Sequence, residues 1–343
     1  MTVRPISPLL KRLGPAAADY AVQRSIGSVD DPYAALGERG REFCRQDTLA
    51  HVDILDVALQ FGSNEAFCQY ALWLGKVLEA RGLPGGHLAA SLRHLGEFFT
   101  GELAEGERQD VMRIVEAGIR ALAGGWAAPE YALEPADEGG ESRQLAETLV
   151  RGDALHANAL LLEWSQADWL PAVVQRIVRP AMGRIGWWWQ QGRISVAEEH
   201  LATEIAHRAV DNAFTRAERK PRRQRTVLLA CVEGNRHALG LRTVADAFDL
   251  DGWTAYNLGA DVPLATLPRM IAAFQPELVG LSVSMTQQLP AARQAIEAIR
   301  EMRPTRPIRV MLGGLASNSL QEAWQWLGAD LAAPDGVRAI EAA

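Results

Sequence analysis

The C-terminal part of the chain alternates short apolar runs with amphipathic segments, and this alternation constrains the fold more than any other feature. The apolar runs begin at Thr226, Thr254, Leu278 and Ile308, and a segment with helical periodicity follows each of the first three. Uninterrupted apolar runs are typical of strands buried on both faces, and strand–helix alternation is typical of a parallel sheet. We therefore predict a Rossmann-like α/β domain with a parallel sheet at residues 218–343.

The preceding part of the chain has helical periodicity throughout, apart from one interruption. Segments rich in apolar residues at spacings of three and four predict helices. A cluster of Gly, Pro and acidic residues at 124–141 has the composition of a linker. The predicted protein is thus multidomain: an N-terminal arm at 1–33, an all-α helical domain at 34–123, the linker, a four-helix bundle cap at 142–217 and the α/β domain.

Composition and charge exclude several classes of protein. The net charge of −7 argues against a general polyanion binder, so we expect no direct contact with nucleic acid, and the basic stretch at 216–225 is interpreted as a solvated linker. Without an apolar stretch of about 18 residues or a signal-peptide pattern, we expect a cytoplasmic protein with no membrane contact. Cys44, Cys68 and Cys231 form no CxxC pair, which fits a reducing compartment; Cys44 or Cys68 could hold a chromophore, but a buried thiol is the commoner case.

The residues that follow the predicted strands are the most informative. Asn235, His237 and Gly240 follow the first strand, Ser282 and Ser284 end the third, and Gly313 and Gly314 end the fourth. Ligands of parallel sheets bind beyond the carboxyl ends of the strands. A neutral imidazole on a strand-to-helix loop is a good metal ligand, provided that an acceptor orients its second nitrogen. The sequence therefore predicts a ligand site with His237 as a metal ligand.

These residues resemble the cobalamin-binding domain of methionine synthase, corrinoid carriers and light-dependent cobalamin repressors. The resemblance implies that His237 is the lower axial ligand of cobalt, that Asn235 and Gly240 complete its loop, and that Ser282, Ser284, Gly313 and Gly314 line the slot of the nucleotide tail. The chain departs from the family at Asn235, where an acidic residue is usual. The orienting acceptor for the imidazole is then expected to be the Asn235 amide oxygen or Glu233.

A second motif lies in the predicted bundle. Nine residues separate Trp189 from Glu199 and His200, and this spacing resembles that of CarH-type light sensors, which bind adenosylcobalamin. The resemblance implies that Trp189 packs over the upper face of the corrin and that Glu199 and His200 contact the adenosyl group. An indole can exclude water there, and a carboxylate can accept hydrogen bonds from a ribose. Gln190 stands where the CarH repressors have a His that caps cobalt after photolysis, so a water or another His such as His200 would serve.

Three further residues near this motif are expected to stabilise the fold and not to bind a ligand. Trp187 and Trp188 precede Trp189 directly, and we interpret both as core packing. His207 lies seven residues after His200 on the same helix face and is interpreted as structural rather than as a second ligand.

The N-terminal all-α domain resembles the helical domain that precedes such modules in photocobilins, on the segments CRQDTLAHVDILDVAL and YALWLGKVLEARGLP. That resemblance implies a biliverdin site. By residue type the candidates are His51, Arg45 and Tyr70, with Trp73 and Arg81 as further aromatic and cationic groups. A dimerisation or docking bundle is the alternative for this domain. No helix-turn-helix with a basic recognition helix and no enzyme barrel is recognisable in the sequence.

These observations predict a photoreceptor without enzymatic activity that binds adenosylcobalamin and biliverdin. Photolysis of the cobalt–carbon bond is expected to shift the cap against the α/β domain and to change the state of a homo-oligomer, which signals to an unidentified effector. The alternative is a corrinoid protein that carries methyl groups for a separate methyltransferase. A sensor that uses only a bilin or a haem is a third possibility, which His237 disfavours.

Overall fold

The computed structural model describes residues 7–25, 37–84, 86–136, 140–302, 306–320 and 322–343. The chain divides into two compact units, which we describe separately. One unit comprises residues 1–133 together with 190–192, and the other comprises 134–189 and 193–343. None of the helices in the described ranges is long and apolar enough to cross a membrane.

The first unit is an all-α domain. Its helices are α1 (Ser7–Ser25), α2 (Gly37–Phe61), α3 (Asn64–Ala80), α4 (Gly86–Glu102) and α5 (Glu105–Arg120), followed by a π turn, η2 (Ala121–Gly125), and a 3₁₀ turn, η3 (Glu130–Ala132). One apolar cluster joins the helices, with Leu55, Phe67, Leu92 and Ile114 fully shielded from solvent. Gly118 allows α5 to pack closely on α3, because a Cβ at this position would lie 2.7 Å from the Phe67 ring.

The N-terminal segment expected as an arm contains a helix. Over the described part of 1–33, α1 buries Leu10 and Ala17 in the same cluster as α2. Gly14 and Pro15 lie inside this helix and obscure its periodicity in the sequence. A Cβ at Gly14 would lie 3.6 Å from Val52 and 3.8 Å from Leu49 of α2, so this position of α1 faces α2.

The second unit begins with the four-helix cap. Its helices are α6 (Glu141–Val150), α7 (Ala154–Ala167), a continuous segment made of α8 (Leu170–Val173), η4 (Val174–Val178) and α9 (Arg179–Gln190), and α10 (Val196–Arg216). The π turn η4 ends two residues before Pro180, which has no N–H to donate and whose ring would clash with a regular preceding turn. This arrangement confirms the predicted bundle.

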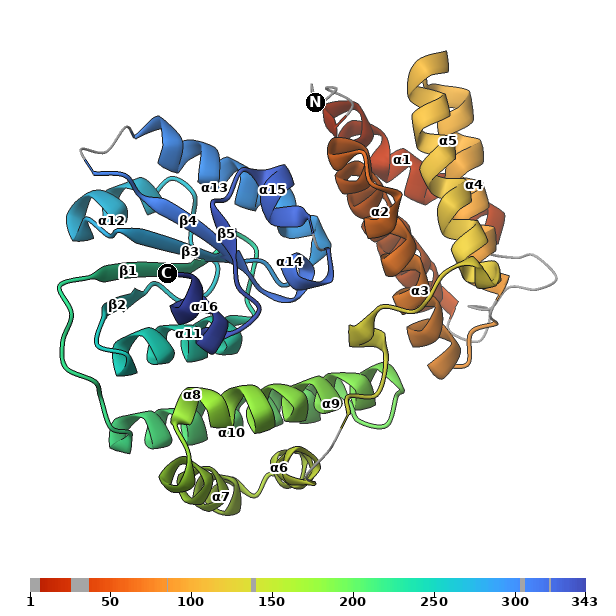
Figure 1. The fold of residues 1–343 in the computed structure, drawn as a ribbon. Coiled ribbons are helices and arrows are strands. Elements are labelled where there is room, and N and C mark those ends of the chain that lie inside the picture. Colours follow the sequence, from red (N-terminus) through yellow and green to blue (C-terminus); the bar gives the residue numbers. More distant parts are fainter. Residues whose placement is uncertain (1–6, 26–36, 85, 137–139, 303–305, 321) are drawn as a thin grey trace. The chain divides into compact units, whose positions relative to one another are not determined.

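The remainder of the second unit is a five-stranded parallel sheet with the order β2-β1-β3-β4-β5. The strands are β1 (Thr226–Cys231), β2 (Thr254–Asn257), β3 (Leu278–Ser282), β4 (Arg309–Gly313) and β5 (Leu331–Ala332). The helices are α11 (Ala238–Leu250), α12 (Leu267–Phe274), α13 (Leu289–Glu301), α14 (Leu315–Ser319), α15 (Ala323–Leu327) and α16 (Gly336–Ala342), with a 3₁₀ turn, η5 (Thr286–Gln288). Figure 1 shows α11 and α16 on one face of the sheet and α12 and α13 on the other. The predicted doubly wound α/β fold is confirmed.

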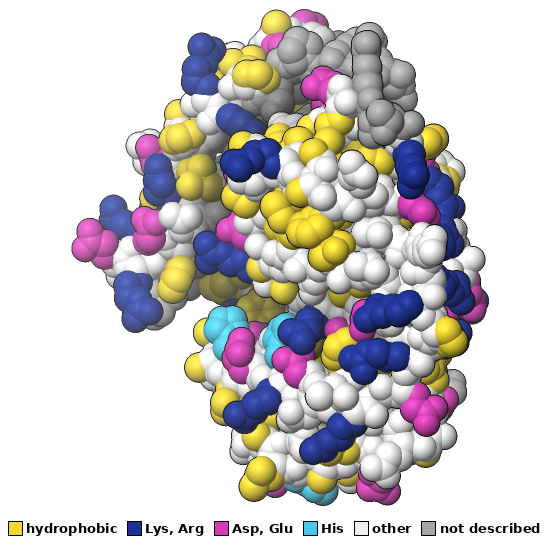
Figure 2. Space-filling view, turned by 90° about the vertical axis from the view of Figure 1, so that its left-hand side faces the viewer, with side chains coloured by type: hydrophobic (Ala, Val, Ile, Leu, Met, Phe, Trp, Pro, Cys, Tyr) yellow, Lys and Arg dark blue, Asp and Glu magenta, His cyan; other side chains and the backbone are white. Residues whose placement is uncertain are grey.

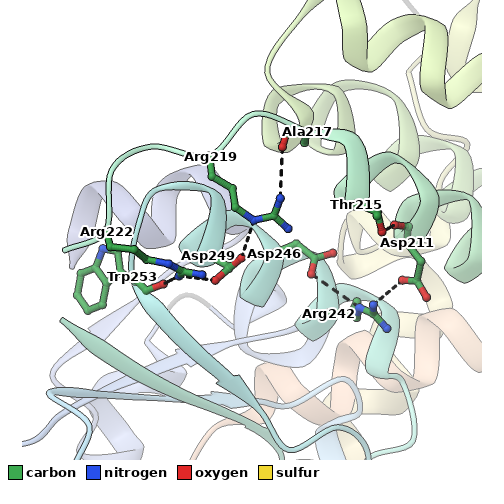
Figure 3. Close-up of polar contacts among 9 residues, drawn as sticks. All are labelled: Asp211, Thr215, Ala217, Arg219, Arg222, Arg242, Asp246, Asp249 and Trp253. Atoms are coloured by element: carbon green, nitrogen blue, oxygen red, sulfur yellow. Dashed lines mark hydrogen bonds and ion pairs between the residues drawn. The ribbon is translucent and has the colours of Figure 1, made fainter. Parts of the chain in front are cut away.

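The basic stretch between the cap and the sheet is exposed to solvent, as predicted, but its side chains also form ion pairs. Arg219 and Arg222 both pair with Asp249 near the end of α11, at 3.2 and 2.6 Å (Figure 3). Lys220 lies 2.7 Å from Asp251, a carboxylate that is only 1% exposed. The acidic end of α11 thus compensates the basic charge of the stretch. On the face drawn in Figure 2, Lys and Arg side chains are likewise interspersed with Asp and Glu.

Helices α10 and α11 join the cap to the α/β layer. Arg242 of α11 lies between Asp211 of α10, at 2.7 Å, and Asp246 of its own helix, at 3.7 Å (Figure 3). Leu250 of α11 is part of the apolar core of the cap. The four helices and the sheet therefore share both an apolar and an ionic contact.

Candidate functional site

Three strands end at the same level of the sheet. Cys231 at the end of β1 is paired in register with Ser282 of β3, and Ser282 is paired with Gly313 of β4. The chain order reverses between β1 and β3, and such a switch point opens a crevice at the carboxyl edge of a parallel sheet. The loops that carry the predicted site residues therefore emerge side by side.

The loop after β1 holds His237 through Asn235. The Asn235 side chain is completely buried: its Oδ1 accepts the backbone N–H of His237 at 3.1 Å, and its Nδ2 donates to the Ser282 carbonyl at 2.8 Å. Its backbone carbonyl accepts from Asp261 N–H at 2.8 Å. A satisfied buried amide of this kind fixes backbone geometry. Asn235 thus anchors the His237 loop to the end of β3.

The expected orienting acceptor for the imidazole requires a correction. The amide oxygen of Asn235 accepts the backbone N–H of His237 and not a ring N–H. The Glu233 carboxylate accepts the N–H of Leu264, in the loop after β2. Both groups therefore hold the loops, and among the described residues neither contacts the His237 ring.

The Gly-Gly turn after β4 has a steric cause within the chain. Gly314 has a φ of +97°, and a Cβ there would lie 2.4 Å from the Val283 carbonyl oxygen. Val283 donates its N–H to the Gly313 carbonyl at 2.9 Å. The turn therefore lies directly against the backbone between Ser282, which is buried, and Ser284, which is half-buried and donates its N–H to Gln288.

The donor set at this edge fits a corrinoid. The His237 side chain is exposed and, in the part of the chain that the structure describes, has no side-chain partner, so a ring nitrogen is free for a metal. A Cβ added at Gly240 would meet only open space. The buried Ser317 hydroxyl, in the helix after Gly314, has no hydrogen-bond partner among the described residues. A corrin would bring its own four nitrogen ligands, so a single imidazole, that of His237, would be enough to hold the metal from the chain.

The cap places the second predicted group at the start of α10. Ser195 and Glu198 form a capping box that fixes the first turn of this helix. Glu199 lies in that turn, and its two oxygens contact His200 Nδ1 at 2.6 Å and the Thr203 hydroxyl at 2.9 Å. His200 is largely exposed, and Trp189, at the end of α9, is partly buried. The pair at the start of α10 is thus pre-oriented and accessible.

The residues close to Trp189 and His200 differ in their surroundings. Trp188 packs against the core of the cap, whereas the Trp187 ring carries the Arg193 guanidinium at 4.6 Å from its centroid. His207 is half-buried on α10. Gln190 is 8% exposed, and its Nε2 donates to the Tyr131 carbonyl at 3.0 Å, so its amide holds the segment before the cap.

In the all-α unit, two of the three predicted bilin residues meet each other. His51 Nδ1 lies 2.8 Å from the Tyr70 hydroxyl. Burial, with a smaller contribution from His87, lowers the pKa of His51 to about 3, so this imidazole is neutral. Burial also raises the pKa of Tyr70. Arg45 pairs instead with Asp19 of α1, at 3.0 Å.

The remaining residues considered for this unit are also engaged. The Trp73 ring lies 6.3 Å from that of Tyr70, and the Arg81 guanidinium donates to the Val77 carbonyl. Cys44 and Cys68 are buried free thiols, as is Cys231, and burial raises the pKa of Cys68 and of Cys231 to about 11. The commoner interpretation of these cysteines, as buried thiols, agrees with the structure.

Sequence reasoning missed two groups at the site and one in the cap. Gln288 connects the loops after β1 and β3, and Ser317 lies behind the Gly-Gly turn. Arg184 is fully buried in the cap, where it donates to Glu134 and to the Pro135 carbonyl, both at 2.7 Å. A polar residue within an apolar helical pattern was the available signal for Arg184; Gln288 follows directly on the exposed Gln287, and nothing in the sequence distinguishes the two.

This fold and donor set define a corrinoid-binding module, and comparison with known families agrees. Residues 225–343 match the B12 binding domain, and residues 141–213 match a second B12 binding domain model that covers the cap. The chain therefore carries a cobalamin-binding domain together with its helical cap.

Two relatives illustrate the range of proteins that share this module. The HTH-type transcriptional repressor CarA of Myxococcus xanthus is 32% identical over 143 residues, which are 41% of this chain and 48% of that protein. Dimethylamine corrinoid protein 1 of Methanosarcina acetivorans is 30% identical over 110 residues, 32% of this chain and 50% of that protein. The chain thus spans about half the length of these curated relatives. The similarity agrees with the predicted resemblance to cobalamin-dependent repressors, whereas the photocobilin subtype stays a prediction.

A solved structure supports the fold. The monomethylamine corrinoid protein of Methanosarcina barkeri superposes with a TM-score of 0.51 at 18% identity and covers 58% of this chain and 94% of that one. The likeness concerns the arrangement of the cap and the parallel sheet.

Proposed function

We propose that the protein is a light sensor without enzymatic activity that binds adenosylcobalamin between its cap and its α/β layer. The observation that carries the proposal is the accessible Glu199–His200 pair, hydrogen-bonded at 2.6 Å in the first turn of α10 and placed ten and eleven residues after Trp189. A carboxylate and an imidazole can both serve a hydroxyl-rich adenosyl group. A methyl group would need neither.

The residues of this chain would have the following roles. His237 would hold cobalt from below, on the loop that Asn235 anchors. Trp189 would exclude water from the upper face, and Glu199 would accept hydrogen bonds from ribose hydroxyls. Adenosylcobalamin supplies a cobalt–carbon bond that visible light breaks.

The proposed output is a change in contacts of the cap. Loss of the adenosyl group would remove the ligand contacts of Trp189 and Glu199. The arrangement of the cap that those contacts stabilise would then become less populated. We propose that this change alters the oligomeric state of a homo-oligomer in the cytoplasm and so reaches an effector.

The test uses the full chain, reconstituted with adenosylcobalamin in the dark. Illumination with green light should convert the alkylcobalamin absorption bands to those of a photolysed cobalamin, and light scattering should report a change in molar mass. Preferential uptake of methylcobalamin, with no change of mass on illumination, would contradict the proposal. The His237→Ala variant is the control for ligation from below.

A methyl-carrying corrinoid protein is the second candidate. It is favoured by the dimethylamine corrinoid relative and by the superposition on the monomethylamine corrinoid protein. A carrier must deliver its methyl group to a partner enzyme, so it should bind methylcobalamin at least as tightly as adenosylcobalamin. The two affinities, measured in the dark, separate the candidates.

We also propose that the all-α unit holds biliverdin close to the His51–Tyr70 pair. The supporting observation is that His51 is neutral and buried beside a phenol, because such a pair can hydrogen-bond pyrrole groups. Addition of biliverdin should give a bound absorption band beyond about 600 nm, where corrinoids absorb little. The Tyr70→Phe variant should shift this band, and the absence of any bound band in the wild type would refute the bilin site.

A further inference from the structure

Gln288 lies at the junction of the two loops that carry the predicted lower-face residues. It ends the turn η5 and is 7% exposed. Its Oε1 accepts the backbone N–H groups of Ser284 at 3.1 Å and of Met285 at 3.0 Å. Its Nε2 donates to the Gly234 carbonyl at 3.0 Å. One side chain thus connects the loop after β3 with the loop after β1.

The hydrogen bonds of Gln288 complement those of Asn235. Asn235 connects the His237 N–H to the Ser282 carbonyl, and Gln288 connects the Gly234 carbonyl to the N–H groups of Ser284 and Met285. The loop after β1 is therefore connected to the segment after β3 at two consecutive residues, Gly234 and Asn235, which directly precede Arg236 and His237. Gly234 is further held by Asp261, whose carboxylate accepts its N–H at 2.7 Å.

We infer that Gln288 is a positioning residue for His237: its carboxamide sets the distance between the His237 loop and the Ser282–Ser284 segment, and so the place of the imidazole relative to the corrinoid. The inference rests on the role of His237 proposed above. Residues that orient a metal ligand typically change metal affinity by about 10- to 100-fold when they are removed. Gln288 would act in this way through the backbone, without touching the ligand.

The chain offers a matched set of variants. Gln288→Ala removes both halves of the connection. Gln288→Glu keeps the acceptor for Ser284 and Met285 but loses the donor to Gly234. Gln287→Ala is the control, because Gln287 is the exposed neighbour in the same turn.

The first measurement is amide hydrogen exchange of the apoprotein. Gln288→Ala should speed exchange at Ser284 and Met285 by about tenfold or more, because both amides lose their acceptor. Gln288→Glu should restore protection at these two amides but not at residues 234–237. Gln287→Ala should leave both segments unchanged. If the amides of Ser284 and Met285 exchange in the Gln288→Ala protein at the same rate as in the wild type, the inference is overturned.

The second measurement uses aquacobinamide, which lacks the nucleotide tail and its benzimidazole, so that His237 is the nitrogen ligand supplied by the chain. Gln288→Ala should reduce the affinity about 10- to 100-fold and weaken the absorption change that reports nitrogen ligation. Equal affinity and spectrum in the wild type and the variant would overturn the inference. Adenosylcobalamin that resists photolysis would instead refute the light-sensing function and leave the Gln288 result standing.

Discussion

The side-chain amide of Asn235 donates to the backbone carbonyl of Ser282 at 2.8 Å, across the switch point of the sheet. This contact explains why an amide is suited to the position. Its Oδ1 must accept from His237 N–H while its Nδ2 must donate to a carbonyl. A carboxylate can do only the first.

Asn235→Asp is therefore expected to destabilise the apoprotein. An ionised Asp would place a buried negative charge against the Ser282 carbonyl oxygen, at a cost of about 1–3 kcal/mol. The protonated acid can donate to that carbonyl, so the loss of stability should be smaller at pH 5 than at pH 8. Urea unfolding at both pH values measures the difference, and an equal loss at the two would contradict this account.

A second pH dependence should come from Asp246. Burial raises the pKa of its carboxyl from 3.8 to about 7, opposed by Arg242 and Arg219 and reinforced by Asp211 and Asp249. Between about pH 4 and pH 7 the folded state therefore binds more protons than the unfolded state. The free energy of unfolding should fall as pH rises through this window, by on the order of 2–4 kcal/mol.

Asp246→Asn should flatten this pH dependence and leave the protein at least as stable as the wild type at pH 8. Glu277→Gln is the control, because Glu277 pairs with Arg225 and is not among the groups that shift the pKa of Asp246. Thermal unfolding between pH 4 and pH 8 provides the measurement. If the stability of Asp246→Asn depends on pH as steeply as that of the wild type, another group causes the pH dependence.

Gly314→Ala should be among the most damaging small substitutions in the α/β layer. The positive φ disfavours any side chain, and the new Cβ would overlap the Val283 backbone, so we expect a loss of about 2–4 kcal/mol. Gly328→Ala is the matched control: its φ is +79°, but its Cβ would meet nothing within 4 Å. If both variants unfold at the same denaturant concentration, the contact with Val283 contributes little.

Trp189→Ala should weaken binding of adenosylcobalamin about tenfold or more and affect methylcobalamin less, because the proposed indole contact is with the adenosyl side. Trp187→Ala is the comparison, since its ring carries Arg193. Absorption titrations in the dark give both affinities. Equal losses for the two cobalamins would place Trp189 in the general packing of the cap.

The fold of the second unit was predictable because its patterns are local. The apolar runs from Thr226, Leu278 and Ile308 each gave a strand, and the parallel order follows from the helices between them. The edge strand β5 has two residues, too few for a pattern. The helix α1 was missed because Gly14 and Pro15 interrupt its periodicity, although the helix packs through this very segment.

The polar contacts of the site were less predictable. Asn235 was recognised as part of the His237 loop, but its partner Ser282 lies 47 residues away, and the direction of the contact depends on the register of β1 and β3. The basic stretch is exposed as predicted, but its ion pairs were not predicted, because the partners Asp249 and Asp251 approach only once α11 is folded. Such long-range pairs follow from the fold and not from local spacing.

The anchoring of the His237 loop also has a thermodynamic consequence. Fixing the backbone of one residue costs roughly 1–2 kcal/mol of conformational entropy, and here Asn235 fixes the loop through hydrogen bonds within the chain itself. That loss is incurred when the chain folds and not when a corrinoid arrives. Substitutions that loosen this loop should consequently lower corrinoid affinity even where they touch no atom of the bound molecule.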